Sequence, residues 1–162
     1  MSLAVIYSRA LSGMQAPLVE VEAHLANGLP AFNIVGLPDT EVKESRDRVR
    51  AAILQSGFDF PAKKITVNLA PADLPKESGR FDLPIALGVL AASGQIAPDE
   101  LAAYEFAGEL ALSGALRPVR GALAMAWQGM QAGRAFVLPA DNAKQAALMQ
   151  GIAVFGAESL GQ

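Results

Sequence analysis

The sequence contains no cysteine and a single histidine, and this scarcity removes several classes of site. Without cysteine there is no disulfide, no thiolate zinc site and no cysteine nucleophile, so redox chemistry is excluded and packing alone must stabilise the fold. Charged residues make up 18% of the chain and hydrophobic residues 52%. Because charged residues usually make up roughly 25% of soluble domains, we expect this surface to meet another domain.

Long apolar runs are also missing. No segment approaches the roughly 20 apolar residues of a membrane helix, and the segment 3–7 is too short for a signal-peptide core. A cytoplasmic location without a membrane partner is therefore expected. The net charge of −3 indicates that any nucleic-acid contact must be local. Most of the seven Phe, two Tyr and one Trp must serve the core, which argues against strong binding of single strands.

Three enzyme signatures are missing as well. The sequence has no G-x-x-x-x-G-K-[S/T] phosphate loop, no G-x-G-x-x-G dinucleotide fingerprint and no G-x-S-x-G nucleophile elbow. We therefore do not expect this stretch of sequence to hydrolyse ATP.

The pattern that is present alternates strands and helices over a length of 162 residues, which suits one core. Apolar alternation and β-branched content predict strands at 3–10, 18–25, 31–35, 64–69, 106–110, 115–118, 136–138 and 152–155. Helical periodicity predicts helices at 38–57, 81–93, 98–102, 121–131 and 142–149. We expect the first two strands to form a hairpin, and the last two to lie parallel around a crossover helix.

Charged residues on the predicted helix 38–57 are spaced as ion pairs. Asp39 and Lys43, and likewise Glu44 and Arg48, are four positions apart and face away from the apolar stripe. This spacing favours a solvated helix face over a binding patch.

The one histidine, His24, shares a strand face with Glu20 and Glu22. This row crudely suggests metal ligation. A flat strand splays such side chains, however, and most rows of this kind are the wet face of a sheet, so no metal site is predicted.

Two longer segments carry the most specific information. They are 68–87, NLAPADLPKESGRFDLPIAL, and 108–121, GELALSGALRPVRG. Both closely resemble the N-terminal domain of the YifB/ComM family, and the resemblance extends over essentially the whole chain. It implies an α/β Lon-protease-like fold, a mixed sheet with helices packed on it. This fold is shared with the C-terminal domain of the recombination protein RadA, in the superfamily of the second domain of small-ribosomal-subunit protein five.

The resemblance also implies an organisation. Residues 1–162 would form a single N-terminal domain, and an AAA+ magnesium-chelatase-like motor that binds ATP and magnesium would follow Gln162. The parent is then expected to be a homo-oligomer, a hexamer, acting as a DNA helicase or branch-migration factor in natural transformation and recombination. The resemblance implies that this domain contacts its own motor and binds DNA only weakly. It implies no cofactor for the domain itself. Related chelatase subunits use the same motor to insert magnesium into porphyrin, so a protein-recruitment adaptor of such a motor is an alternative.

Lon protease uses a serine at the start of its central helix and a lysine on the next long helix. In this sequence the matching positions are Asp82 and Leu123, which supply neither a nucleophile nor a base. We therefore expect a domain without catalysis, with Asp82 capping the central helix. The rival reading is a Ser/Lys hydrolase that has relocated its residues to Ser78 and Lys76, although loop lysines are usually solvated and loop serines usually bond to backbone.

Basic residues recur in the same two segments. They are Lys76 and Arg80 before the central helix, and Arg117 and Arg120 on either side of Pro118. If they converge on one surface, they are candidate contacts to DNA phosphates, to the adjoining motor or to a neighbouring subunit. The alternative is that they make salt bridges to Asp73, Asp82 or Glu109 that only fix the loop.

Overall fold

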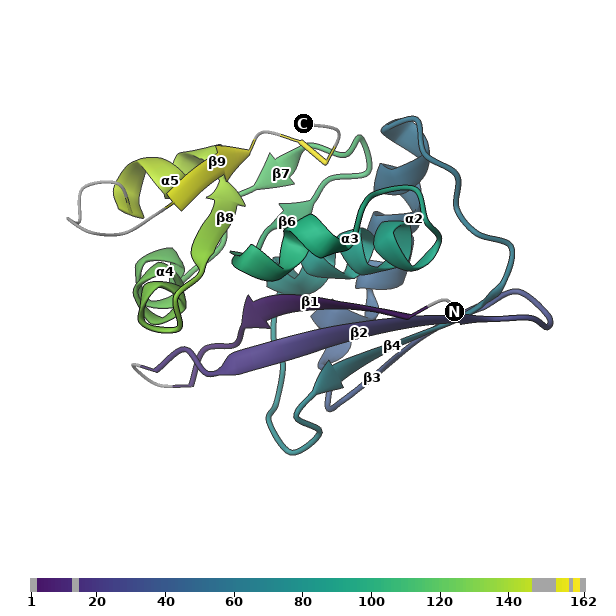
Figure 1. Ribbon diagram of the computed structural model, residues 1–162, viewed down its shortest axis with the longest axis horizontal. Coiled ribbons are helices and arrows are strands. Elements are labelled where there is room, and N and C mark those ends of the chain that lie inside the picture. The colour runs from purple at the N-terminus through teal and green to yellow at the C-terminus, as the bar shows by residue number, and fades with distance from the viewer. Residues whose placement is uncertain (1–2, 13–14, 147–153, 158, 161–162) are drawn as a thin grey trace.

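A mixed seven-stranded sheet forms the centre of the computed structural model, which describes residues 3–12, 15–146, 154–157 and 159–160 (Figure 1). The sheet has the order β3-β4-β2-β1-β5-β8-β9. Its strands are β1 (Leu3–Arg9), β2 (Leu18–Ala26), β3 (Ala31–Val35), β4 (Lys64–Ala70), β5 (Tyr104–Phe106), β8 (Ala135–Pro139) and β9 (Val154–Ala157). A separate two-stranded sheet contains β6 (Glu109–Leu110) and β7 (Leu116–Arg117).

Helices connect these strands. The α-helices are α1 (Thr40–Lys43), α2 (Ser45–Gln55), α3 (Asp82–Ala92), α4 (Ala122–Gln131) and α5 (Ala140–Ala146). Two short 3-10 helices, η1 (Gly79–Phe81) and η2 (Asp99–Ala103), precede α3 and β5. The α/β class predicted from the sequence is confirmed.

Strand pairing follows the predicted pattern at both ends of the chain. The strands β1 and β2 form an antiparallel hairpin, and β8 and β9 are parallel neighbours. Part of the predicted segments 142–149 and 152–155 lies outside the described residues. The strand expected over 106–110 is divided, because the chain leaves the large sheet after Phe106 and residues 109–110 pair with β7 instead.

The helix predicted over 38–57 is interrupted at Glu44, which ends α1 and begins α2. Asp39 caps α1, since its carboxylate accepts a hydrogen bond from the Val42 N–H at 2.8 Å. The predicted apolar stripe is buried at Val42, Ser45, Val49, Ala52 and Ile53.

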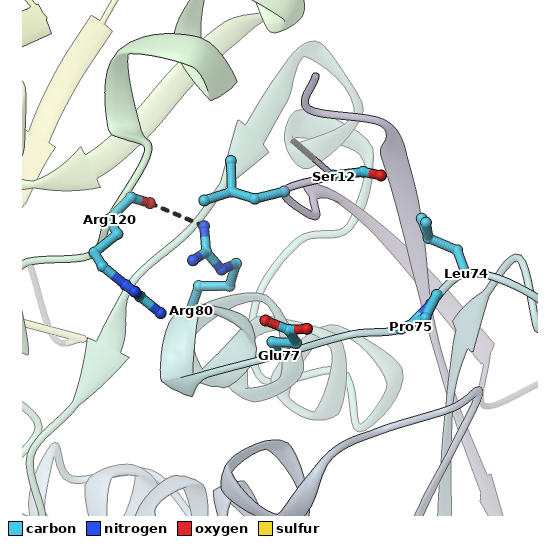
Figure 2. Close-up of a pocket in the computed structure, with 7 residues that line it drawn as sticks. Ser12, Leu74, Pro75, Glu77, Arg80 and Arg120 are labelled. Carbon is cyan, nitrogen blue, oxygen red and sulfur yellow. Dashed lines mark hydrogen bonds between the residues drawn. The ribbon is translucent and has the colours of Figure 1, made fainter. Parts of the chain in front are cut away.

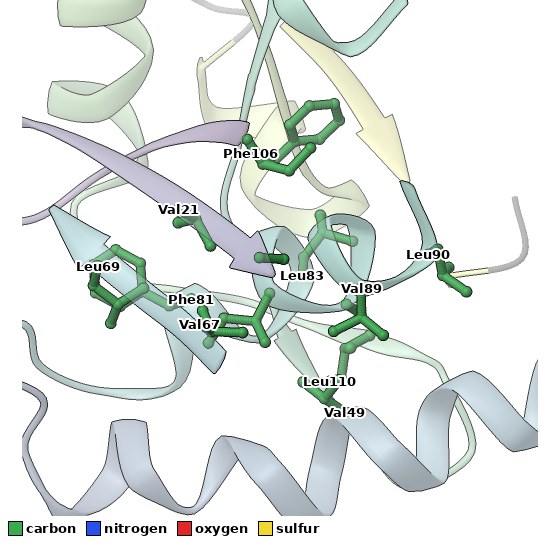
Figure 3. Close-up of a cluster of buried hydrophobic side chains, with 14 of the residues drawn as sticks. Val21, Val49, Val67, Leu69, Phe81, Leu83, Val89, Leu90, Phe106 and Leu110 are labelled. Atoms are coloured by element: carbon green, nitrogen blue, oxygen red, sulfur yellow. The ribbon is translucent and has the colours of Figure 1, made fainter. Parts of the chain in front are cut away.

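Helix α3 lies at the centre of the main hydrophobic core, which Figure 3 shows. One face of α3 packs on β1 and β2, and α2 packs against α3. Gly88 permits this close approach, because a Cβ there would lie 3.1 Å from the Cβ of Ala23 in β2. The burial expected for this helix from its apolar sequence is confirmed.

A second hydrophobic cluster joins α4 to β8. Met125 and Phe136 are fully buried within it, and Leu138 lies beside them. Over the described ranges, no helix has both the length and the apolar content needed to cross a bilayer.

Candidate functional site

The loop that leads into α3 is held against the loop between β3 and α1. The Asp39 N–H donates to the Lys76 carbonyl at 3.0 Å, and the Lys76 N–H donates to the Leu37 carbonyl at 3.1 Å. Beyond this bridge, Ser78 adopts a φ of 68°, in the left-handed region. The chain then turns into η1 and brings Arg80 inward.

Lys76 is fully buried, so the expectation of a solvated loop lysine is wrong. Its Nζ donates a hydrogen bond to the carbonyl of Pro71. Burial lowers the pKa of the Lys76 amine, and the charge of Asp73 opposes that shift. A residue without exposed surface cannot touch DNA directly, so Lys76 orders the loop rather than forming part of its surface.

Arg80 and Arg120 come together at an open pocket with a volume of about 480 Å³ (Figure 2). Arg80 is 3% exposed, and its Nη1 donates to the Arg120 carbonyl at 2.9 Å. The pocket is lined by Leu11, Ser12, Leu74, Pro75, Glu77, Arg80 and Arg120. Two of the four basic candidates named from the sequence therefore lie at one pocket.

The Arg80 guanidinium has polar partners but lacks a bonded countercharge. Its Nε donates to the Ser78 hydroxyl at 3.1 Å, and its Nη1 also lies 3.6 Å from the sulfur of Met125. Burial lowers the pKa of Arg80, the charge of Arg120 lowers it further, and Glu77 opposes both. Among the residues that the structure describes, neither arginine forms an ion pair. The pocket is thus suited to an anion.

Arg117 does not line this pocket. It lies on β7, where it is exposed and stands opposite Glu109 in the β6–β7 register. Of the four basic candidates, the structure brings together Arg80 and Arg120, buries Lys76 and leaves Arg117 on a separate strand.

The carboxylate of Asp82 is fully buried and does not cap its own helix, so the capping prediction is wrong. It accepts hydrogen bonds from the Ser45 hydroxyl, from the Leu110 N–H at 3.0 Å and from Arg48 Nε at 2.7 Å. Burial raises the pKa of Asp82, while these bonds act in the opposite direction. The salt bridge expected between Asp82 and a basic loop residue is made by Arg48 instead.

Lys76 and Ser78, the alternative candidates for a Ser/Lys hydrolase, form hydrogen bonds to different groups rather than to each other. The Lys76 amine is directed to Pro71, whereas the Ser78 hydroxyl accepts from Arg80. Leu123, which the resemblance to Lon protease matched to a lysine, lies on α4 and is 45% exposed, whereas Asp82 is buried.

The row of Glu20, Glu22 and His24 follows one face of β2, as the alternation predicts. Glu22 accepts a hydrogen bond from Asn68 Nδ2 at 2.7 Å, and His24 is exposed opposite Thr66. In the described ranges, no group of three or more His, Asp or Glu side chains is placed to hold a metal ion.

One buried charge cluster was missed by sequence reasoning. Glu105 on β5 is fully buried and binds Arg9 through two hydrogen bonds of 2.7 and 2.8 Å. Arg134 binds the same carboxylate at 3.0 Å and lies 3.9 Å from the ring centroid of Tyr7. The available signal was a lone acidic residue between Tyr104 and Phe106 in an otherwise apolar strand.

Comparisons with known proteins give a consistent result. The family model for subunit ChlI of Mg-chelatase matches residues 21–142. The chain is 54% identical over 160 residues to the uncharacterized protein YifB of Salmonella typhimurium, covering 99% of this chain and 32% of that protein. It is 52% identical to the competence protein ComM of Haemophilus influenzae, covering 99% and 31% respectively. An uncharacterized Mycobacterium bovis protein is 42% identical, with 100% and 32% covered. The chain thus spans about a third of the length of these relatives.

Proposed function

This chain belongs to the family of subunit ChlI of Mg-chelatase, with YifB and ComM proteins as relatives, and from that membership we propose that it is a non-catalytic domain of a magnesium-chelatase-like AAA+ ATPase. In this proposal the domain has a Lon-like fold and lies N-terminal to the motor. The motor would hold ATP and magnesium and assemble as a hexamer. The parent would act on DNA as a helicase or branch-migration factor during transformation and recombination.

The arrangement around α3 supports a domain without its own chemistry. The carboxylate at the position of the Lon serine is occupied by hydrogen bonds from Ser45, Arg48 and Leu110. A nucleophile needs a base within hydrogen-bond reach, and the side chains of Lys76 and Ser78 bond to different groups. These contacts favour a structural role for the residues that a hydrolase would use.

The domain would contact its partner through the pocket that holds Arg80 and Arg120, and this pair of arginines is the observation that supports such a contact. Among the described residues the buried guanidinium of Arg80 forms no ion pair, although Glu77 lines the same pocket, and the exposed Arg120 lies beside it. This excess of positive charge favours an anionic partner. In the assembled protein this partner would be a DNA phosphate or a carboxylate of the motor or a neighbouring subunit. Both groups present two oxygen atoms that the planar guanidinium of an arginine can bind in a bidentate way.

The test uses the full-length protein that contains this sequence. Because Arg120 is exposed, Arg120→Glu should keep the fold, whereas the buried Arg80 is a poor target for mutation. We expect Arg120→Glu to weaken DNA stimulation of the ATPase several-fold if the anion is DNA, or to weaken ring assembly if it is a carboxylate. Arg117→Glu is the matched control, since it makes the same charge change outside the pocket. Normal stimulation and normal assembly in Arg120→Glu would disprove the contact.

The ChlI family match also favours a second function, a recruitment adaptor for a chelatase-like motor. The adaptor and the DNA-related function differ in their client. Pull-down of the separately produced motor by this chain, with and without DNA, distinguishes them. Capture that needs no DNA and is unchanged by adding it would support the adaptor.

A further inference from the structure

A second basic surface surrounds β3, the terminal strand of the large sheet. Two hollows lie along this strand, with volumes of about 320 and 580 Å³. The first is lined by Pro30, Ala31, Phe32, Arg50, Phe60, Pro61, Ala62 and Lys63, and the second by Asn33, Ile34, Val35, Lys43, Arg46, Lys64 and Thr66. Since consecutive residues of β3 line both, we refer to them together as the β3 groove.

The β3 groove concentrates positive charge on an acidic protein. Five of the 13 Lys and Arg residues line it, although the chain carries a net charge of −3. All five are exposed, and none forms an ion pair with any residue in the described part of the chain. Of the acidic side chains in the described ranges, none lines either hollow. Such a local field attracts a polyanion at short range, whatever the net charge of the whole chain.

Three of these cations form a stripe along α1 and α2. Arg46 and Arg50 are four positions apart on α2, which places them on one side of that helix, and Lys43 at the end of α1 lines the same hollow as Arg46. Lys63 and Lys64 approach from the start of β4, next to β3. Asp47 directly follows Arg46 and Glu44 directly follows Lys43, and these two negative charges should reduce the attraction.

Aromatic rings lie at one end of the groove. The ring centroids of Phe32 and Phe60 are 5.5 Å apart, and both rings are half-buried. The guanidinium of Arg50 lies 5.3 Å from the centroid of Phe60. Aromatic and guanidinium planes are the surfaces on which unpaired bases stack in single-strand-binding proteins. Sequence reasoning missed this platform because Phe32 and Phe60 lie far apart in the chain.

We propose that the β3 groove binds single-stranded nucleic acid, with the cations on the phosphates and a base against Phe60 and Arg50. The five residues of β3 give the groove a length of about 16 Å, enough for a few nucleotides. A duplex would bring the phosphates but keep its bases stacked away from the rings, so single strands should bind more tightly. This inference depends on the proposed function only for the choice of DNA as the polymer.

The test is fluorescence anisotropy of a labelled oligothymidylate of about 20 nucleotides, titrated with this chain. We expect weak binding at low salt, with the logarithm of affinity falling against that of salt with a slope of about −2 to −4, for three to five phosphates. The double variant Arg46→Glu/Arg50→Glu should lose at least about ten-fold in affinity. Phe60→Leu should lose about five-fold or more, since stacking contributes about 1–3 kcal/mol per base. Asp47→Asn should bind more tightly than the wild type.

Controls separate this groove from general charge and from the other site. Arg117→Glu alters an exposed arginine on β7, on the opposite side of the ribbon in Figure 1, and should bind like the wild type. Thermal unfolding should first show that Phe60→Leu remains folded, and Phe32→Leu provides a second ring variant. Equal losses in Arg117→Glu, unchanged binding in both ring variants, or equal affinity for a blunt duplex would each overturn the proposal. If Arg120→Glu abolishes binding while the groove variants retain it, the DNA-related function stands and the β3 groove is not its site.

Discussion

Arg48 of α2 and Asp82 of α3 form a two-point ion pair, in which Arg48 Nε donates to Asp82 Oδ2 at 2.7 Å and Nη2 donates to Oδ1 at 3.1 Å. The pair is asymmetric, because the Asp82 side chain is fully buried and that of Arg48 is 22% exposed. Burial lowers the pKa of Arg48, but the hydrogen bond and charge of Asp82 act together with the charges of Glu109 and Glu44 in the opposite direction, and the net shift is upward. The pair therefore fixes the start of α3 against α2.

The asymmetry of this pair predicts unequal mutational effects. Arg48→Met leaves a buried carboxylate without its countercharge and should lower the free energy of unfolding by about 3–5 kcal/mol at neutral pH. Asp82→Asn leaves a guanidinium that water can reach, so it should be less damaging, at about 1–3 kcal/mol. Urea denaturation measures both. Equal losses would show that the exposure of Arg48 does not matter.

The double variant Arg48→Met/Asp82→Asn is the control for the ion pair, because the asparagine oxygen can still accept the hydrogen bonds from Ser45 and Leu110. With both charges removed, no buried charge is left without a partner. The double variant should therefore regain much of the free energy of unfolding that Arg48→Met loses. If the double variant is as unstable as the sum of the two single changes, the pair contributes through packing rather than charge.

Lys76 predicts a distinctive dependence of stability on pH. Burial lowers the pKa of its amine in the folded state, so the unfolded chain binds more protons between that lowered pKa and the usual value of 10.5. The free energy of unfolding should therefore rise with pH through this window, as the buried amine loses its charge. Below the window the amine is charged, and the whole cost of burying that charge lowers the stability of the folded state. Lys76→Met removes the charge and keeps most of the volume, so it should be at least as stable as the wild type at pH 7.

The measurement for Lys76 is the difference in urea midpoint between Lys76→Met and the wild type from pH 7 to about 10.5. We expect the advantage of the methionine variant to shrink as pH rises. Lys76→Ala should be destabilised at every pH, because it leaves a cavity in the buried site. A difference between Lys76→Met and the wild type that does not change with pH would mean that the amine is not desolvated.

Local sequence patterns predicted most of the secondary structure. The alternation in 18–25 predicted β2, and the apolar character of residues after Phe81 predicted the buried α3. The order of the strands was less accessible, because β4 reaches its place between β2 and β3 through contacts distant in sequence. The division of 106–110 between two sheets is also non-local, since it depends on where β7 lies.

The candidate site was predictable only in part, for the same reason. The motif identified Arg80 and Arg120, which do share a pocket. The spacing of Glu44 and Arg48 predicted a surface ion pair, found at 3.9 Å, but not the closer partner Asp82, 34 positions along the chain. The burial of Lys76 depends on how the loop folds back against residues 37–39, which no local pattern encodes.

The buried cluster at Glu105 predicts a ranking among its partners. Arg9 binds the carboxylate through two hydrogen bonds and is nearly buried, whereas Arg134 supplies one bond and is partly exposed. Arg9→Met should therefore lower the free energy of unfolding by about 3–5 kcal/mol, and Arg134→Met by clearly less. Denaturant unfolding of the two variants side by side tests the ranking. A larger loss for Arg134→Met would reverse it.

Gly36 lies at the end of β3 with a φ of 107°, and a Cβ there would fall 2.2 Å from the carbonyl oxygen of Leu69. Gly57, after α2, also has a positive φ, of 88°, but an added Cβ would meet nothing within 4 Å. Gly57→Ala should therefore show only the conformational cost, about 1 kcal/mol. Gly36→Ala adds a backbone clash and should be destabilised by clearly more than that, about 3 kcal/mol or above. Because the two variants differ mainly in that contact, the gap between their unfolding midpoints measures the closeness of β3 and β4. Equal midpoints would mean that the two strands separate readily at this point, and that the β3 edge is less rigid than its register implies.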